Sequence, residues 1–170
     1  FSRKTSGRPE PVCLQQVHDG AMSIMYGKLS KVKAEVNWPR GLDKIYVMGD
    51  TVRLEQVLVN LISNALQAME QSPLPVIDIA IAEDGAEMCL QVRDHGPGIP
   101  KSDIGLVFEP FYTTKKAGQG LGLGLSISHR IIESMGGCLS VTNHPLGGAV
   151  FRISLPLAQA PDNLTGTTIG

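Results

Sequence analysis

Residues 56–69 are Gln-Val-Leu-Val-Asn-Leu-Ile-Ser-Asn-Ala-Leu-Gln-Ala-Met, and this stretch decides the fold. Its apolar residues recur every three or four positions, which is the period of a helix that buries one face. The pattern predicts a helix over residues 52–71, with Asp50 or Thr51 as its N-cap and Pro73 beyond its end. The apolar face comprises Leu54, Val57, Leu58, Leu61, Ile62, Ala65 and Met69. The opposite face carries a stripe of amides: Gln56, Asn60, Asn64, Gln67 and Gln71.

The amide stripe has two interpretations. A solvated helix face is the simpler one, but such faces usually carry Lys and Glu, and Asn is a poor helix former. Amides at i and i+4, such as Asn60 and Asn64, can both donate to and accept from a ligand. An Asn carbonyl oxygen also suits Mg²⁺, whose other ligands are often water and phosphate. The stripe therefore indicates a site for Mg²⁺ and a polyphosphate, with the solvated face as the alternative.

A first glycine loop, Asp94-His95-Gly96-Pro97-Gly98-Ile99, follows a predicted strand at residues 87–93. Its glycines allow a sharp turn and the close approach of a flat ligand. Asp94, at the end of the strand, can accept a hydrogen bond from an exocyclic amine such as adenine N6. A plain turn is the alternative, because Asp-x-Gly is common in turns.

A second glycine loop, Gly118-Gln119-Gly120-Leu121-Gly122-Leu123-Gly124-Leu125, leads into a predicted helix at residues 123–135. Backbone N–H groups at the start of a helix form an anion site, helped by the helix dipole. Glycine at every second position is unlikely in a purely structural turn, because each glycine costs conformational entropy. This loop is therefore predicted to bind phosphate.

Aromatic and basic residues lie between the two loops, at residues 108–116. Phe108 and Phe111 are predicted to anchor a loop at its base, and Lys115 to reach a phosphate as a point charge. Aromatics in the core and solvated lysines are the alternative, which is favoured for Lys116.

The pattern around these motifs predicts an α+β domain: a two-layer sandwich in which helices cover one face of a mixed sheet. A first helix is expected at residues 11–31, and a short helix at 102–108 inside a long loop at 94–120. Residues 1–10 are expected to be a linker, 11–157 the domain and 158–170 a flexible tail. Turns are predicted at Asp84-Gly85 and Gly147-Gly148, and a helix end at Gly136-Gly137. The strands are expected at 32–38, 45–48, 76–82, 87–93, 139–142 and 149–155.

Composition excludes several classes of protein. The 170 residues carry 15 basic and 16 acidic side chains, a net charge of −1, which removes the electrostatic signature of a nucleic-acid or membrane-surface binder. No apolar run approaches the roughly 20 residues that span a bilayer. Cys13, Cys89 and Cys138 are odd in number and far apart, as expected of reduced thiols in a cytosolic protein. Phe1 suggests a fragment of a longer chain.

Together these motifs resemble the catalytic ATP-binding domain of sensor histidine kinases, a member of the Bergerat-fold ATPase superfamily. Residues 56–69 are similar to the N box of that family, 94–98 to the G1 box, 108–111 to the F box and 118–125 to the G2 box. Residues 148–156 resemble its closing strand, and the resemblance covers roughly residues 30–156. The wording of residues 65–69 and 111–115 is similar to the nitrogen-regulatory and C4-dicarboxylate-sensing kinases.

The resemblance implies roles for individual residues. Asn64 would coordinate Mg²⁺ between the phosphates, and Asn60 would contact phosphate or the water shell of the metal. Asp94 would bind the adenine amine, with Ile99 packed on the base, under a mobile ATP lid at about residues 100–120. The remaining residues implied in nucleotide binding are Gln67, Gly96, Gly98, Tyr112, Lys115, Gly118, Gly120, Leu121, Gly122, Leu123 and Gly124.

Three positions depart from the family pattern. Gln67 stands where many members have Lys, and Leu121 where Thr or Ser is common. Relatives that hydrolyse ATP have a Glu one turn before the Mg²⁺-binding Asn, and here that position is Asn60. An amide cannot act as a base, so the resemblance favours phosphoryl transfer to a protein group over hydrolysis.

The resemblance also implies partners. None of His18, His95, His129 and His144 lies in the family's acceptor motif, so the acceptor is expected on a dimerisation and phosphoacceptor domain upstream of Phe1. A response regulator receiver domain would take the phosphoryl group onward. The fragment is expected to be a monomer and a cytoplasmic domain, for which an inner-membrane sensor is one parent protein. Alternatives are a non-catalytic ATP-sensing module and a serine-directed relative such as an anti-sigma-factor kinase.

Overall fold

The computed structural model of the chain describes residues 8–112 and 124–162. The strands are β1 (Glu10–Cys13), β2 (Glu35–Asn37), β3 (Tyr46–Gly49), β4 (Val76–Asp84), β5 (Glu87–Arg93), β6 (Cys138–Asn143) and β7 (Ala149–Ala158). The helices are α1 (Leu14–Lys31), α2 (Thr51–Ala68) and α3 (Gly124–Ser134), with short 3-10 turns at Leu42–Lys44 and Ile104–Leu106.

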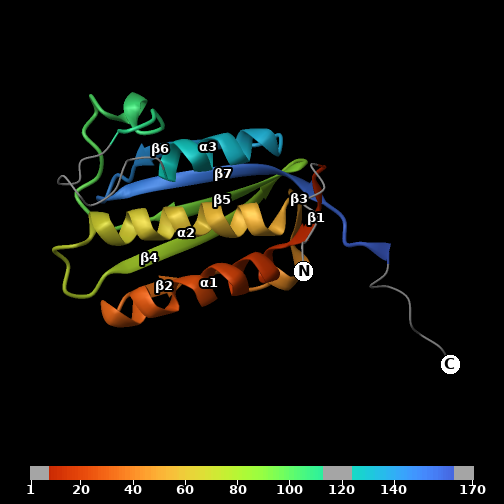
Figure 1. Cartoon of the computed structure of the whole chain (residues 1–170), viewed down its shortest axis with the longest axis horizontal. Helices are drawn as coiled ribbons and strands as arrows, with labels where there is room; N and C mark the ends of the chain where they lie inside the picture. Colours follow the sequence, from red (N-terminus) through yellow and green to blue (C-terminus); the bar gives the residue numbers. More distant parts are fainter. Residues whose placement is uncertain (1–7, 113–123, 163–170) are drawn as a thin grey trace.

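One mixed sheet forms the back layer of the fold. Its strand order is β1-β3-β7-β5-β4-β2, and β6 also pairs with β7. The pairing of β2 with β4 is parallel, whereas the other pairs among the described strands are antiparallel. Helices α1, α2 and α3 lie side by side over one face (Figure 1). The predicted two-layer α+β sandwich is therefore confirmed.

Helix α2 begins within one residue of the predicted start, for local reasons, but it ends at Ala68 and not at residue 71. The Asp50 side chain accepts a hydrogen bond from the Arg53 backbone N–H at 3.0 Å, so Asp50 is the N-cap. The apolar face is buried against the sheet and the neighbouring helices, and each of the seven predicted residues is at most 4% exposed. Burying such a face contributes roughly 25 cal/mol per Å² of apolar surface, which makes α2 the central helix of the core.

The strands alternate between the covered and the open face of the sheet, as a half-buried strand does. On β5, Met88, Leu90 and Val92 are buried under the helices. On β7, Phe151 and Ile153 fill the same layer. This core fixes the end of β5, which is where the first glycine loop begins.

The N-terminal prediction was wrong in one respect. The helix expected at 11–31 begins at Leu14, because the preceding residues form the edge strand β1. Strand β1 pairs with β3, with Glu10 opposite Gly49, so the strand also includes the last residue of the expected linker. The apolar residues of β1 happen to continue the helical period of α1, and the partner of β1, strand β3, lies more than 30 residues further along the chain.

Other boundaries differ by less. The strand expected at 32–38 is limited to Glu35–Asn37, and the short helix expected at 102–108 is a 3-10 turn at Ile104–Leu106. The turns at Gly85 and Gly147-Gly148 form with positive φ angles, and Gly136 ends α3 with φ +78°. The strand at 149–155 continues to Ala158, where its last residues pair with β3.

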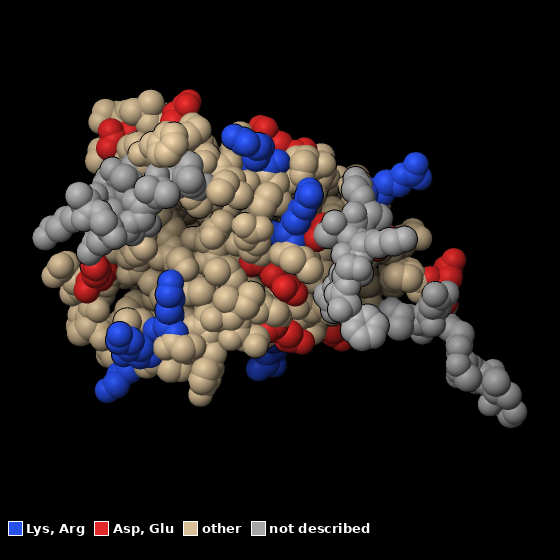
Figure 2. Space-filling model, in the orientation of Figure 1, with Lys and Arg blue, Asp and Glu red and all other residues tan. Residues whose placement is uncertain are grey.

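The described residues include no membrane-spanning helix, and charged side chains of both signs are mixed on the helical face (Figure 2). Within the described residues, no helix combines the length and apolar character needed to cross a bilayer. Figure 2 shows Lys and Arg side chains interspersed with Asp and Glu side chains over the helical face. A mixture of this kind gives no extended basic surface on this face for a polyanion.

Removing the cap of α2 should weaken the fold. We expect Asp50→Ala to lower the free energy of unfolding by about 1 kcal/mol, since the Arg53 N–H loses its acceptor. Urea denaturation measures this change. Asp50→Ser, which keeps a side-chain acceptor, should stay near the wild type; an equal loss in both variants would contradict a capping role.

Candidate functional site

A buried carboxylate stands at the end of β5. Asp94 is 2% exposed, and its backbone N–H donates to the Ala149 carbonyl oxygen at 3.1 Å. One carboxylate oxygen, Oδ1, accepts from the backbone N–H groups of Gly96 at 2.9 Å and Ala149 at 3.2 Å. Burial raises the pKa of the Asp94 carboxyl, and these two hydrogen bonds offset part of that rise. The other oxygen, Oδ2, accepts no hydrogen bond from the described residues.

The Asp94 loop, residues 94–99, packs against the C-terminal end of α2. A Cβ on Gly96 would lie 2.6 Å from the Ala68 carbonyl oxygen, so only glycine fits there. The neighbouring His95 backbone N–H donates to Met69 Sδ at 3.3 Å. Gly98 has φ +80°, and Ile99 packs at the edge of the core. The structure thus brings the predicted residues of the first glycine loop next to the end of α2.

The amide stripe of α2 is only partly solvated. Asn60 and Asn64 are half-buried, whereas Gln67 is exposed. Asn60 Nδ2 donates to the Gly124 carbonyl oxygen at 3.3 Å and to Ser128 Oγ at 3.1 Å, which joins α2 to the first turn of α3. The plain solvated face is therefore not the right description of the two asparagines.

The Asp94 loop and the two asparagines lie along the C-terminal half of helix α2. Ala68, which contacts the loop, and Asn60 are separated by about 12 Å along the axis of α2, at 1.5 Å per residue. Asn64 lies between them, and Gly124 begins α3 at the Asn60 end. The Asp94 loop, Asn64 and Asn60 are therefore spread over about 12 Å along one helix.

One of the two predicted aromatic anchors is confirmed. The Phe108 ring stacks on His129 of α3, with centroids 5.0 Å apart, and meets Phe151 of β7 edge-on at 6.3 Å. Phe111, in contrast, is 69% exposed, so the prediction that it anchors the loop was wrong. Phe108 therefore holds the base of this segment against α3 and the sheet.

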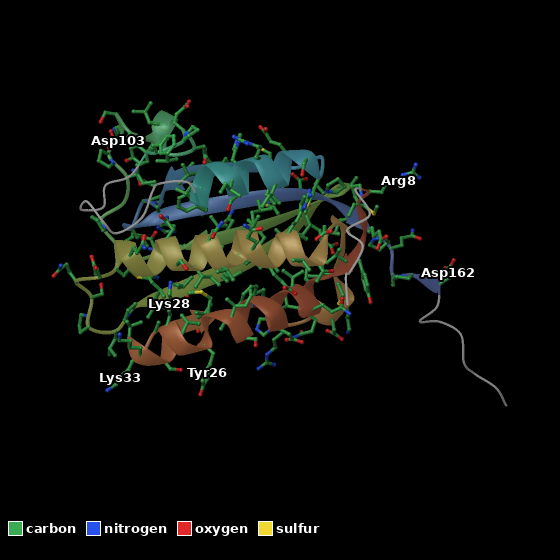
Figure 3. The ribbon with its side chains drawn as sticks, in the orientation of Figure 1. Arg8, Tyr26, Lys28, Lys33, Asp103 and Asp162 are labelled. Carbon is green, nitrogen blue, oxygen red and sulfur yellow. The ribbon has the colours of Figure 1, made fainter. Side chains whose placement is uncertain are left out.

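Tyr112 is the last described residue before the second glycine loop. Its hydroxyl donates to Asp103 Oδ2 at 3.1 Å. Burial is the main cause that raises the pKa of the tyrosine, and the hydrogen bond to Asp103 raises it further. Asp103 lies on the segment beyond the end of the sheet (Figure 3). The other predicted ligand-binding residues of this region lie outside the described residues: Lys115, Gly118, Gly120, Leu121, Gly122 and Leu123.

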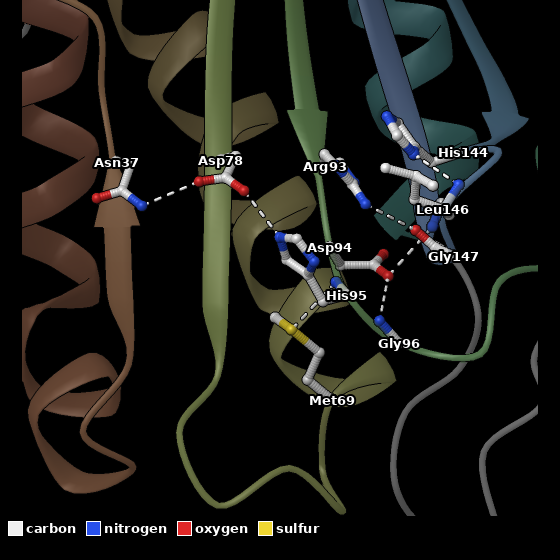
Figure 4. A network of polar contacts seen from close by, with 11 residues as sticks. Asn37, Met69, Asp78, Arg93, Asp94, His95, Gly96, His144, Leu146 and Gly147 are labelled. Atoms are coloured by element: carbon white, nitrogen blue, oxygen red, sulfur yellow. Dashed lines mark hydrogen bonds and ion pairs between the residues drawn. The ribbon is translucent and has the colours of Figure 1, made fainter.

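Sequence reasoning missed a polar network beside Asp94 (Figure 4). Asn37 Nδ2 donates to Asp78 Oδ1 at 2.9 Å, and His95 Nε2 donates to Asp78 Oδ2 at 2.7 Å. The contact with Asn37, then that with His95, lowers the pKa of Asp78. Arg93 donates to the Gly147 carbonyl oxygen at 3.3 Å. These partners come from strands, a loop and a turn that are far apart in the sequence, and no local sequence signal could have found them.

Comparison with known proteins agrees with this geometry. Residues 49–159 match the family described as histidine kinase-, DNA gyrase B-, and HSP90-like ATPase. The chain belongs to this ATPase family. The resemblance noted from the four motifs is thereby confirmed, and the matched segment contains both the asparagines of α2 and the Asp94 loop.

Named relatives of this ATPase domain are sensor kinases. The chain is 37% identical to the two-component sensor PprA of Pseudomonas aeruginosa over 164 residues, which is 93% of this chain and 18% of PprA. It is 34% identical to the C4-dicarboxylate transport sensor protein DctB of the same organism, over 91% of this chain and 26% of DctB. The chain therefore spans 18% to 26% of the length of these relatives.

Solved structures of histidine kinases share the fold. The catalytic domain of the histidine kinase ThkA superposes with a TM-score of 0.75 at 30% identity, over 87% of this chain and 95% of that domain. Full-length ShkA in complex with AMPPNP matches with a TM-score of 0.70 at 29% identity, over 89% of this chain and 32% of ShkA. ThkA in complex with the response regulator TrrA matches with a TM-score of 0.71 at 27% identity, over 88% of this chain and 42% of ThkA.

The buried charge of Asp94 should cost the ATPase domain stability. For a carboxyl whose pKa is raised in the folded state, stability is highest below the unfolded pKa of about 3.9 and falls as pH rises through the folded pKa. We therefore expect Asp94→Asn to be at least as stable as the wild type at pH 7.5, since the amide oxygen can still accept from Gly96 and Ala149.

Thermal unfolding between pH 4 and pH 8 measures this effect. The advantage of the variant should grow with pH, and Asp43→Asn, which changes an exposed carboxylate, serves as the control. A variant that unfolds at a lower temperature than the wild type at pH 7.5 would contradict the expectation.

Proposed function

We propose that this chain binds ATP with Mg²⁺ and transfers the γ-phosphoryl group to a histidine on a dimerisation and phosphoacceptor domain, as part of two-component signalling. The observation that carries the proposal is the Asp94 carboxylate. One of its oxygens accepts from two backbone N–H groups, and the other, which accepts from none of the described residues, would accept from the ligand. Kinase relatives named as sensors, and the AMPPNP complex of ShkA, support it.

Adenine suits the end of the site beside Asp94. A buried carboxylate oxygen accepts strongly from the exocyclic amine of adenine, and Ile99 offers an apolar surface for the base. Guanine carries a carbonyl oxygen at that position, and two acceptors would then face each other in a desolvated site. A site built around a specific polar partner rejects the wrong one strongly, so ATP should be preferred over GTP.

The asparagine end suits phosphate and Mg²⁺. Within the described residues, no group of His, Cys, Asp and Glu side chains could hold a metal ion. The Asn64 carbonyl oxygen is a hard ligand of the kind that Mg²⁺ accepts, and phosphates and water would complete its coordination. When bound, Mg²⁺ would neutralise the negative charge that develops on the phosphates during phosphoryl transfer. Asn60, next to Gly124, would contact the phosphates or the water around the metal.

Transfer to a protein group is favoured over hydrolysis by the chemistry of Asn60. Its amide has no basic group with which to activate water, and its nitrogen is already engaged with Gly124 and Ser128. Phosphoryl transfer asks mainly for positioning and charge stabilisation, which the described side chains can supply. The acceptor histidine would come from a separate helical domain, and the complex of ThkA with TrrA supports a response regulator as the next partner. With this partner, we infer a cytoplasmic location for the chain.

Nucleotide binding by this chain is the first test. We expect calorimetric titration to show ATP binding that strengthens with Mg²⁺ and little binding of GTP. Asp94→Asn should weaken ATP binding about 100-fold, because a donor would face the adenine amine and a charged hydrogen bond is lost. Asn64→Ala should weaken only the Mg²⁺-dependent part, by about 10-fold. Gln16→Ala, which removes an exposed amide from α1, is the matched control. Unchanged ATP binding in Asp94→Asn would contradict the assignment of the site.

Phosphoryl transfer needs its own measurement. With γ-labelled ATP and the phosphoacceptor domain of the parent protein supplied in trans, we expect an acid-labile phosphohistidine on that domain. Asn64→Ala should lose about 10-fold or more of the transfer rate, since positioning of the phosphates fails. Acid-stable label would instead identify a serine-directed kinase. ATP binding without any label would identify a non-catalytic sensing module.

A further inference from the structure

The side chain of Asn143 makes an unusual pair of contacts. Asn143 is the last residue of β6, and its Oδ1 accepts from the Ile99 backbone N–H at 2.8 Å. Its Nδ2 donates to the Ile99 backbone carbonyl oxygen at 2.7 Å. One amide thus satisfies both backbone groups of a residue 44 positions away, in the way that a neighbouring strand would. The Asp94 loop ends at the residue that is held.

The turn that follows Asn143 is also fixed to the other end of the loop. Ala149 exchanges hydrogen bonds with Asp94, as described above. Gly148, at φ +85°, lies so close that a Cβ there would collide with the Asp94 carbonyl oxygen. Within the turn, the His144 N–H donates to Gly148 O at 2.8 Å, and the Leu146 N–H to His144 Nδ1 at 3.0 Å. The turn between β6 and β7 is therefore internally braced.

Different residues hold the two ends of the Asp94 loop. Ala149 holds the residue that would accept from the adenine amine, and Asn143 holds the residue that would pack on the base. Between them, Gly98 lies directly against Asn143, since a Cβ on Gly98 would be 2.8 Å from Asn143 Oδ1. The spacing between Asp94 and Ile99 is thus set from outside the loop.

We propose that Asn143 is a positioning residue for nucleotide binding: it holds the Ile99 peptide so that the apolar wall of the base pocket is in place before ATP arrives. This inference rests on the proposed function. Asn is specifically suited, because its amide offers an acceptor and a donor in one plane, spaced to match a peptide. Asp keeps the acceptor but turns a carboxylate oxygen toward the Ile99 carbonyl, and Ala removes both contacts. A pre-formed pocket binds more tightly because less ordering accompanies binding.

The test compares Asn143→Ala, Asn143→Asp and the control Thr142→Ala, an exposed neighbour on β6. Each is titrated with ATP and Mg²⁺, and backbone amide exchange is followed by NMR. We expect Asn143→Ala to bind ATP about 10-fold more weakly and to lose protection of the Ile99 amide, while the core amide of Val92 stays protected. Asn143→Asp should keep the Ile99 amide protected yet also bind ATP weakly. Thr142→Ala should match the wild type in each measurement.

A purely structural role predicts a different result. It would lower the unfolding temperature and the protection of Val92 together with ATP affinity. Such a pattern, or wild-type ATP affinity in Asn143→Ala, would overturn the proposal. If the wild-type chain itself binds no ATP, the proposed function fails and this inference fails with it; wild-type binding that is insensitive to Asn143 overturns the inference alone.

Discussion

The arrangement of the site depends on one buried carboxylate and the two backbone N–H groups that hold it. Asp94 Oδ1 joins the loop after β5, through Gly96, to the start of β7, through Ala149. Burying a carboxylate is unfavourable unless hydrogen bonds compensate it, and here only one of its oxygens is compensated by the described protein. This incomplete satisfaction is the reason why we propose Asp94 as the residue that binds the base, because a ligand donor would supply the missing hydrogen bond.

Helix α2 supplies the other half of the constraint. Its apolar face builds the core, so the opposite face is held rigidly, and the two asparagines project from a helix that cannot rotate without exposing that core. The contact of Gly96 with Ala68 and that of Asn60 with Gly124 then fix the Asp94 loop and α3 relative to the same helix. One face of α2 therefore packs the core, and its opposite face fixes the geometry of the proposed site.

The features that sequence predicted well are those with local causes. Helix α2 is set by its apolar period and its Asp50 cap, and Asp94 is marked by its position between a strand and a glycine turn. The features it missed depend on distant partners. No local pattern marks strand β1, which is defined by its pairing with β3. The residues around Asn143 likewise do not indicate a contact with Ile99. Both Phe108 and Phe111 were predicted to anchor the loop, but only tertiary packing decides which ring is buried.

The distance in sequence between the partners of Asp94 and Ile99 affects how the protein is made. The hydrogen bonds of Asp94 with Ala149 join residues that are 55 positions apart, and those of Ile99 with Asn143 join residues that are 44 positions apart. At ribosomal rates of about 5–20 residues per second, several seconds separate the synthesis of the carboxylate from that of its backbone donor. Non-local pairings of this kind also form late in folding, because a long loop must close first. A nascent chain therefore carries Asp94 as an ordinary solvated acid, and the contacts that hold the Asp94 loop form only once the final hairpin has emerged and docked.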